Sequence, residues 1–212
     1  MLMKKIAILS QKGGTGKTYF STNLSVAAEL AGHTTVLLDL DPQSSSAKWG
    51  DNRAEDTPAV ISTHAERLPK MLQLAEENGA SFAVIDTAPH TESAALDAAR
   101  AADLVIIPCK PDLVSIQAIG TTIDLVHLAK TPARIVLNGV THYGMLAEQA
   151  RVGLHIYDIP SAPCDIGDRI AFTHAYNAGF GVQEFQPRSK ASAEITALYQ
   201  YILKTMESPY AS

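Results

Sequence analysis

Cysteine is scarce in this chain and histidine is scattered, which disfavours a disulfide framework or a metal centre built from these residues. The two cysteines, Cys109 and Cys164, lie far apart and neither belongs to a C-x-x-C pair. Such sparse thiols are typical of a reduced, cytoplasmic protein. The seven histidines lack the H-x-x-x-H and H-E-x-x-H spacings that bring two imidazoles onto one metal ion.

Long apolar runs and an excess of basic charge are absent too. No segment approaches the roughly 20 apolar residues that a membrane-spanning helix needs. Residues 1–5 lead directly into a strand-like run, without the apolar core of a signal peptide. The 17 basic residues are outnumbered by 22 acidic ones, for a net charge of -5. Bulk charge therefore does not indicate a nucleic-acid binder, and any DNA contact would need a local basic patch, such as one assembled by dimerisation.

The chain does have a repeated alternation of short apolar runs and longer amphipathic stretches. Its composition, 46% hydrophobic and 18% charged, is that of a globular protein, and we expect one domain over residues 1–212. Five runs are almost continuously apolar, which is the pattern of strands buried on both faces of a parallel sheet: 6–9, 36–38, 82–85, 104–107 and 135–137.

Helical periodicity fills the stretches between these runs. Apolar residues recur on one face over 20–31, before Gly32, and over 68–75, before Gly79, where glycine suits a helix end. A third helix is expected over 113–130, ending before Pro132. Repeated strand–helix units predict an α/β fold with a doubly wound, mostly parallel sheet and helices on both faces.

A glycine-rich loop follows the first predicted strand and precedes the first predicted helix. Residues 10–18 read SQKGGTGKT, and glycines of this kind let backbone N–H groups turn inward around phosphate oxygens. The helix that follows presents the positive end of its dipole to the same phosphates. Lys17 would reach the β- and γ-phosphates and Thr18 would ligate Mg²⁺. Gln11 stands where the usual G-x-x-x-x-G-K-[ST] pattern has its first glycine.

This loop resembles the deviant Walker A motif of the ParA/MinD superfamily of P-loop ATPases. Lys12 matches the superfamily's signature lysine, and the resemblance implies that it crosses a dimer interface to the partner's nucleotide. A cation at that place would neutralise charge in phosphoryl transfer. Tyr19 stands where many relatives have a second threonine, and we expect it to alter packing near the α-phosphate or the base. The resemblance implies these nucleotide-binding residues: Gly13, Gly14, Thr15, Gly16, Lys17, Thr18, Tyr19, Asn138 and Pro163.

Acidic residues end two of the predicted strands. Asp39 and Asp41 lie in the segment DLDPQ, which resembles the Asp-x-Asp-Pro-Gln of ParA-type proteins. That resemblance implies that Asp41 orients the attacking water, which makes it catalytic with Lys12 and Lys17, and that Asp39 lies near the metal. A capping role in a proline turn is the alternative for both carboxylates. Asp86 closes a buried strand at the Walker B position, where it would hold Mg²⁺.

Asn138 ends the last predicted strand, and in the superfamily that this chain resembles an asparagine at this point commonly contacts the edge of adenine. Guanine-specific P-loop proteins have Asn/Thr-Lys-x-Asp here, whereas this chain reads NGVT without the Lys or the Asp. The cofactors implied are therefore ATP, in preference to GTP, and Mg²⁺. The segment 159–163, which includes Pro163, would form another wall of the base pocket.

A last apolar stripe recurs at helical spacing over 195–206. Core packing is favoured over a MinD-like membrane tail, because Lys190 and Lys204 are offset by Glu194 and Glu207, and no membrane partner is expected. Arg188 and Lys190 are the candidate DNA-contacting residues, with solvated surface charge as the alternative.

The resemblance spans essentially the whole chain and looks like the short ParA subgroup without an N-terminal helix-turn-helix, because the loop starts at Ser10. It implies an ATP-dependent homodimer that binds DNA non-specifically on the nucleoid. An adaptor protein on the cargo would stimulate slow ATP hydrolysis, and repeated cycles would partition plasmid or chromosomal DNA. The alternatives are a protein cargo such as a carboxysome or chemoreceptor cluster, a MinD-like membrane ATPase, and a metabolic or iron–sulfur enzyme on the same scaffold.

Overall fold

The near-continuous apolar runs form a parallel sheet at the centre of the molecule. The computed structural model describes residues 2–141 and 145–207, and within them the strand order is β3-β2-β4-β1-β5-β6-β7, with parallel pairing throughout. The strands are β1 (Lys4–Ile8), β2 (Thr35–Asp39), β3 (Ala59–Ser62), β4 (Phe82–Asp86), β5 (Leu104–Cys109), β6 (Ala133–Val140) and β7 (Ile166–Gly167).

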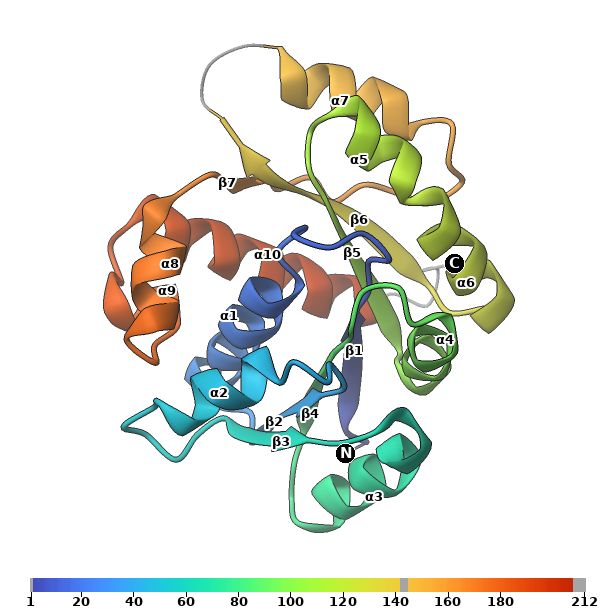
Figure 1. Cartoon of the computed structure of the whole chain (residues 1–212). Coiled ribbons are helices and arrows are strands. Elements are labelled where there is room, and N and C mark those ends of the chain that lie inside the picture. The colour runs from blue at the N-terminus through green and yellow to red at the C-terminus, as the bar shows by residue number, and fades with distance from the viewer. Residues whose placement is uncertain (1, 142–144, 208–212) are drawn as a thin grey trace.

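Helices cover both faces of this sheet (Figure 1). Successive strand residues point to opposite faces, so Ile6 and Ile8 belong to one apolar core while Ala7 and Leu9 belong to the other. The core that contains Ile6 is completed by α1 (Lys17–Leu30), α2 (Ser45–Asp51), α8 (Ile170–Asn177), α9 (Val182–Phe185) and α10 (Lys190–Glu207). The opposite core is completed by α3 (Leu68–Glu77), which follows the short 3₁₀ helix η1 (Ala65–Arg67), and by α4 (Glu92–Ala101), α5 (Leu113–Ala118), α6 (Gly120–Ala129) and α7 (Leu146–Leu154).

The predicted doubly wound α/β fold is confirmed, and each of the five predicted strands is present. Two strands were not predicted. β3 lies at the edge of the sheet with its side chains partly or fully exposed, and β7 has only 2 residues. β3 reads AVIS, so its three apolar residues were a signal that the prediction did not use, whereas β7 is too short to give one.

The helix predicted over 113–130 is divided at Ile119 into α5 and α6. In one continuous helix the carbonyl of Ile116 would accept the N–H of Gly120. Here that carbonyl accepts a hydrogen bond from the Tyr157 hydroxyl at 2.9 Å, and glycine is among the weakest helix formers. A tertiary contact and a poor helix residue thus coincide at the break.

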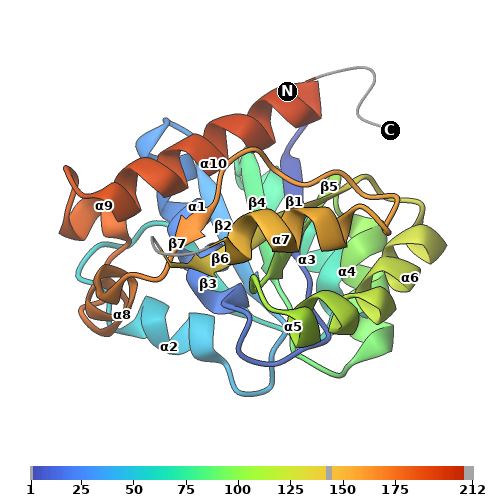
Figure 2. The same cartoon turned by 90° about the horizontal axis from the view of Figure 1, so that it is seen from above.

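The predicted core packing of the last helix is confirmed. α10 buries Ile195, Leu198, Tyr199 and Ile202 against the sheet (Figure 2). Its apolar face is therefore occupied by the protein's own core. Over the described ranges 2–141 and 145–207, we find no helix with the length and hydropathy required to cross a bilayer.

Candidate functional site

The strand order brings the carboxyl ends of β1, β2 and β4 to one edge of the sheet. Asp39 of β2 and Asp86 of β4 are register partners, and Ile8 of β1 pairs with Asp86 on the other side. The glycine-rich loop leaves β1 directly above this point. Ligands of doubly wound sheets bind in the crevice outside the carboxyl ends of the strands, and the predicted phosphate and metal residues meet at that crevice.

Gly16 gives the loop its shape. Its φ of 98° lies in the left-handed region that disfavours side chains, and a Cβ at this position would lie 2.3 Å from Nδ2 of Asn138. That amide donates a hydrogen bond to the carbonyl of Thr15 at 2.6 Å. Asn138 therefore braces the loop from behind, in addition to the base-contacting role predicted for it.

Lys17 is the buried cation of the loop. Only 7% of the residue is exposed, and its Nζ donates a hydrogen bond to the carbonyl of Ser10 at 3.0 Å. Burial lowers the pKa of Lys17, and the charges of Asp86 and Asp41 oppose that effect. A desolvated ammonium group with a neutral carbonyl partner is a strong site for an anion.

Asp86 lies beneath the loop and is 1% exposed. Its Oδ2 accepts a hydrogen bond from the Ser46 hydroxyl at 2.7 Å, whereas Oδ1 is buried without a hydrogen-bond partner among the described residues. Burial, with a smaller contribution from the charge of Asp39, raises the pKa of Asp86 to about 6. A buried carboxylate with an unused oxygen, close to the Thr18 hydroxyl, fits a magnesium site.

Asp39 and Asp41 have different surroundings. Asp39 is completely buried, and its two oxygens accept backbone hydrogen bonds from Asp41 and Ala47, each at 2.9 Å. Burial raises its pKa. Asp39 thus orders the turn between β2 and α2, as in the capping alternative, and its role near a metal stays a prediction. Asp41 is partly exposed, and its Oδ1 accepts the N–H of Gln43 at 2.9 Å.

A cleft of about 310 Å³ opens in front of the loop. Asp41 faces it from the β2–α2 turn, which is the position required of a residue that orients water. Pro89, from the loop after β4, forms the opposite wall and was not predicted. The cleft is lined by Gly13, Gly14, Gly16, Lys17, Thr18, Tyr19, Asp41 and Pro89.

Three other predicted residues lie apart from this cleft. Pro163 is exposed in the segment before β7, and its part in a base pocket stays a prediction. Lys190 is the first residue of α10 and Arg188 lies in the turn before it, and both are exposed. Within the described residues no ion pair involves either of them, and their contact with DNA stays a prediction as well.

Lys12 points away from the loop to α5. Its Nζ donates a hydrogen bond to the Ser115 hydroxyl at 2.8 Å, and that hydroxyl donates to Oδ2 of Asp112 at 2.7 Å. Oδ1 of Asp112 caps α5 by accepting the N–H of Ser115 at 2.8 Å. Sequence reasoning missed Ser115 as a partner of Lys12. Its only local signal was the D-x-x-S spacing of an N-cap, which does not identify a contact made at a separation of 103 residues.

Comparison with known proteins gives three consistent results. The family model described as "CobQ/CobB/MinD/ParA nucleotide binding domain" matches residues 6–159. The chain is similar to the maintenance of carboxysome distribution protein A of Gloeobacter kilaueensis, with 32% identity over 210 residues that cover 95% of this chain and 93% of that relative. It is also similar to the chromosome-partitioning ATPase Soj of Thermus thermophilus, with 25% identity over 192 residues, 73% of this chain and 77% of that relative.

A solved structure shows the same fold. The cell division ATPase MinD of Pyrococcus furiosus superposes with a TM-score of 0.76 at 20% identity, over 96% of this chain and 99% of that one. The resemblance stated from the loop sequence is therefore confirmed at the level of family and fold.

Proposed function

Because the chain belongs to the CobQ/CobB/MinD/ParA family of nucleotide-binding domains, we propose that it is an ATP-dependent dimerising switch that positions a large cargo in the cell. The observation that carries the proposal is the cleft that joins the glycine-rich loop to Asp41, with Asp86 buried beneath it. Nζ of Lys12 lies outside that cleft, hydrogen-bonded to Ser115 of α5. The cleft thus supports the binding of one nucleotide, and Lys12 would contact the nucleotide of a second subunit.

The residues present fit ATP and Mg²⁺. Lys17 and the loop N–H groups would bind the phosphates, while Thr18 and the unused oxygen of Asp86 would hold the metal, directly or through water. Bound Mg²⁺ would neutralise the charge that develops on the phosphates. The absence of Lys and Asp after Asn138 supports ATP over GTP. Comparable displacement of a labelled ATP analogue by GTP would contradict this preference.

We assign Asp41 to the orientation of the attacking water. A residue with that role acts mainly in the transition state, so its loss should lower kcat and leave ATP affinity nearly unchanged. Asp41→Ala should therefore bind Mg–ATP like the wild type and accumulate as a stable dimer in sedimentation. Hydrolysis by Asp41→Ala at the wild-type rate would show that the assignment is wrong.

The ATP-bound dimer would bind DNA through phosphate contacts, with strong salt dependence. The chain as a whole is acidic, so the basic surface would have to be local, with Arg188 and Lys190 as candidates. DNA retention at low salt should then require both ATP and dimerisation. Equal retention with ADP would contradict ATP-gated binding. This activity would place the protein on the nucleoid in its ATP state.

Two kinds of cargo are compatible with this switch. DNA partition is the activity named for Soj, and carboxysome distribution is the activity named for the Gloeobacter relative. The higher identity and the 93% coverage of the latter, against 77% of Soj, support a protein cargo. In both cases an adaptor bound to the cargo would stimulate hydrolysis. Stimulation by an adaptor on a specific DNA site would favour partition, and stimulation by an adaptor on a protein assembly would favour the other function.

An iron–sulfur role has less support from the cysteines. Thiolate is the form that binds metal, and burial raises the pKa of Cys109 to about 12 and also raises the pKa of Cys164. A MinD-like membrane tail would need the apolar face of α10, which is buried against the sheet.

A further inference from the structure

Helix α2 begins four residues after Asp41, which lines the cleft. The turn between them is tight: the N–H of Ser44 donates to the carbonyl of Asp41 at 2.7 Å, and Ser44 has a φ of 52°, in the left-handed region. Few residues other than glycine adopt that conformation without support from their surroundings. The position of Asp41 therefore depends on how firmly the first turn of α2 is held.

The sheet side of that first turn is held by the two buried carboxylates described above. Asp39 accepts the N–H of Ala47, and Asp86 accepts the hydroxyl of Ser46. The opposite side has another anchor, which comes from α8. The hydroxyl of Tyr176 donates a hydrogen bond to the carbonyl of Ser45 at 2.8 Å, across 131 residues of sequence.

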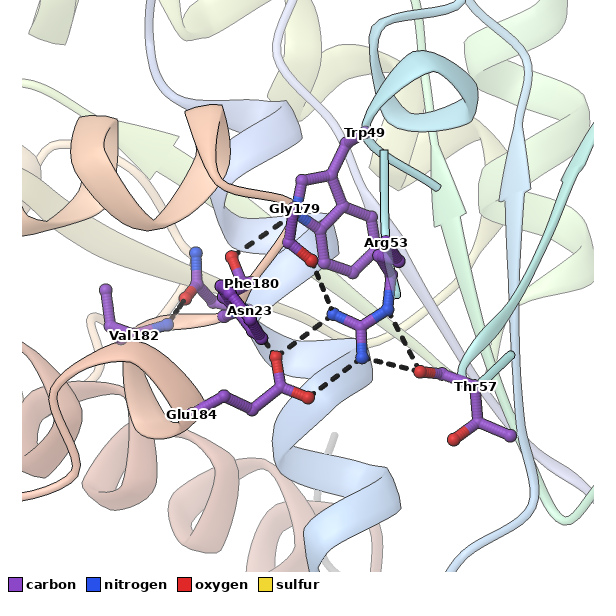
Figure 3. A network of polar contacts seen from close by, with 9 residues as sticks. Asn23, Trp49, Arg53, Thr57, Gly179, Phe180, Val182 and Glu184 are labelled. Atoms are coloured by element: carbon purple, nitrogen blue, oxygen red, sulfur yellow. Dashed lines mark hydrogen bonds and ion pairs between the residues drawn. The ribbon is translucent and has the colours of Figure 1, made fainter. Parts of the chain in front are cut away.

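The last turn of α2 and the residues after it are anchored as firmly (Figure 3). The indole N–H of Trp49 donates to the carbonyl of Phe180 at 3.3 Å. Arg53 lies over the Trp49 ring, with its Cζ 4.7 Å from the ring centroid. Its guanidinium makes a bidentate pair with Glu184, at 2.8 and 3.0 Å, and also donates to the carbonyl of Gly179. The pair is strongly shielded, because the Arg53 side chain is 3% exposed.

Tyr176 also contacts the loop end of the cleft. Its ring meets the ring of Tyr19 edge-on, with centroids 5.4 Å apart, and the Tyr19 hydroxyl lies 3.4 Å from that of Thr173. Tyr19 follows Thr18 and lines the cleft, whereas Tyr176 does not. Tyr176 thus contacts both Tyr19, which lines the cleft, and the first turn of α2, and does not itself line the cleft.

We infer that Tyr176 is a positioning residue for ATP hydrolysis, which holds the first turn of α2 and thereby sets Asp41 against the nucleotide. The inference rests on the water-orienting role proposed for Asp41. The hydroxyl of Tyr176 bonds Ser45 and no residue that lines the cleft, and phenylalanine would keep the ring that packs on Tyr19, so loss of the hydroxyl should lower the catalytic rate and leave ATP affinity nearly unchanged. Because it bonds α2, its loss also loosens the helix that carries Trp49, which is the sole tryptophan of the chain and is 1% exposed.

The test compares Tyr176→Phe with the wild type and with Tyr201→Phe. The control removes a tyrosine hydroxyl of α10 that accepts a hydrogen bond from Arg134 of β6 at 3.1 Å. For Tyr176→Phe we expect kcat to fall about 3- to 10-fold, which corresponds to the loss of one hydrogen bond, while the Kd for Mg–ATP stays within twofold. Acrylamide should quench Trp49 more strongly in this variant. Tyr201→Phe should match the wild type in all three measurements.

A double-variant comparison shows whether the effect passes through Asp41. In an Asp41→Ala background, Tyr176→Phe should not lower the residual hydrolysis of radiolabelled ATP any further. If Tyr176→Phe lowers hydrolysis by the same factor in the Asp41→Ala background as in the wild type, the inference is overturned. A wild-type kcat for Tyr176→Phe would overturn it as well. If Asp41→Ala itself hydrolyses ATP at the wild-type rate, the proposed role of Asp41 fails and the inference fails with it. If Asp41→Ala is inactive while Tyr176→Phe is fully active, the inference alone fails.

Discussion

Nζ of Lys12 lies 2.8 Å from Oγ of Ser115, a residue of the same chain. The hydroxyl of Ser115 is in turn bound to Asp112, at the start of α5. An isolated subunit therefore holds its signature lysine in an internal hydrogen bond. In the dimer proposed above, that bond would have to break before Lys12 could contact a nucleotide in a second subunit, and an ionic contact would replace the hydrogen bond to Ser115.

We expect Lys12→Gln to bind ATP as a monomer. Lys17 and Thr18 remain in place, so the Kd for Mg–ATP should change little. Loss of a charged contact at a desolvated interface costs about 2–5 kcal/mol, and dimerisation with ATP should weaken by tens- to thousands-fold. Sedimentation with ATP–Mg²⁺ and DNA retention at low salt measure the effect, with the exposed Lys70→Gln as control. Normal dimerisation of Lys12→Gln would contradict the crossed-lysine mechanism.

Ser115→Ala should have the opposite effect on dimerisation. The variant removes the hydroxyl that holds Lys12, while the backbone N–H of residue 115 still binds Oδ1 of Asp112 and caps α5. A net hydrogen bond is worth about 0.5–1.5 kcal/mol, so the ATP-dependent dimer should become about 2- to 10-fold tighter per subunit. Ser93→Ala, at an exposed position of α4, is the matched control. Weaker dimerisation of Ser115→Ala would show that the Lys12–Ser115 bond assists assembly.

Asp86→Asn should stabilise the nucleotide-free protein and abolish magnesium-dependent binding. Asp86 has its pKa raised from 3.8 to about 6 in the folded state, so the folded protein binds the proton more tightly than the unfolded chain. Below pH 3.8 this carboxyl is protonated in both states and does not lower the free energy of unfolding. As pH rises towards 6 it lowers that free energy increasingly, and above pH 6 the loss is complete. At pH 7.5 the variant should gain about 1–3 kcal/mol.

Thermal unfolding between pH 5 and 7.5 measures this change in stability. The gain of Asp86→Asn over the wild type should shrink towards pH 5, and the exposed Asp97→Asn should show no such gain. Addition of Mg–ATP should raise the Tm of the wild type much more than that of Asp86→Asn. A gain that stays constant across this pH range would mean that the buried charge is not its cause.

Gly16→Ala should destabilise the protein and weaken nucleotide binding at least tenfold. The new Cβ would lie 2.3 Å from Nδ2 of Asn138, and the amide that braces the loop would have to move. Gly32→Ala is a close control, because Gly32 has a similar φ of 89° but no atom within 4 Å of the place that a Cβ would occupy. Both variants should lose about 1–2 kcal/mol of stability from left-handed backbone strain. Only Gly16→Ala should lose ATP binding, as measured by titration calorimetry.

Local sequence patterns were enough to predict the buried strands and the glycine-rich loop. The continuous apolar runs predicted β1, β2, β4, β5 and β6, because strands buried on both faces need no polar alternation. The glycine-rich loop between a strand and a helix predicted a phosphate site, because its chemistry is contained in nine consecutive residues. Asp86 was picked out because it closes a predicted strand, and Asp41 because the segment DLDPQ after a predicted strand resembles that of ParA-type proteins.

Tertiary structure alone decided the partners of these residues. Lys12 meets Ser115 and Tyr176 meets Ser45 only because the fold places α5 beside the glycine-rich loop and α8 beside α2. The break at Ile119 depends on Tyr157, a residue of a later loop. The raised pKa of Asp86 results from burial that helices distant in sequence complete. Periodicity and turn chemistry are local, whereas hydrogen bonds and desolvation depend on neighbours in space, which the chain acquires only when the sheet is assembled.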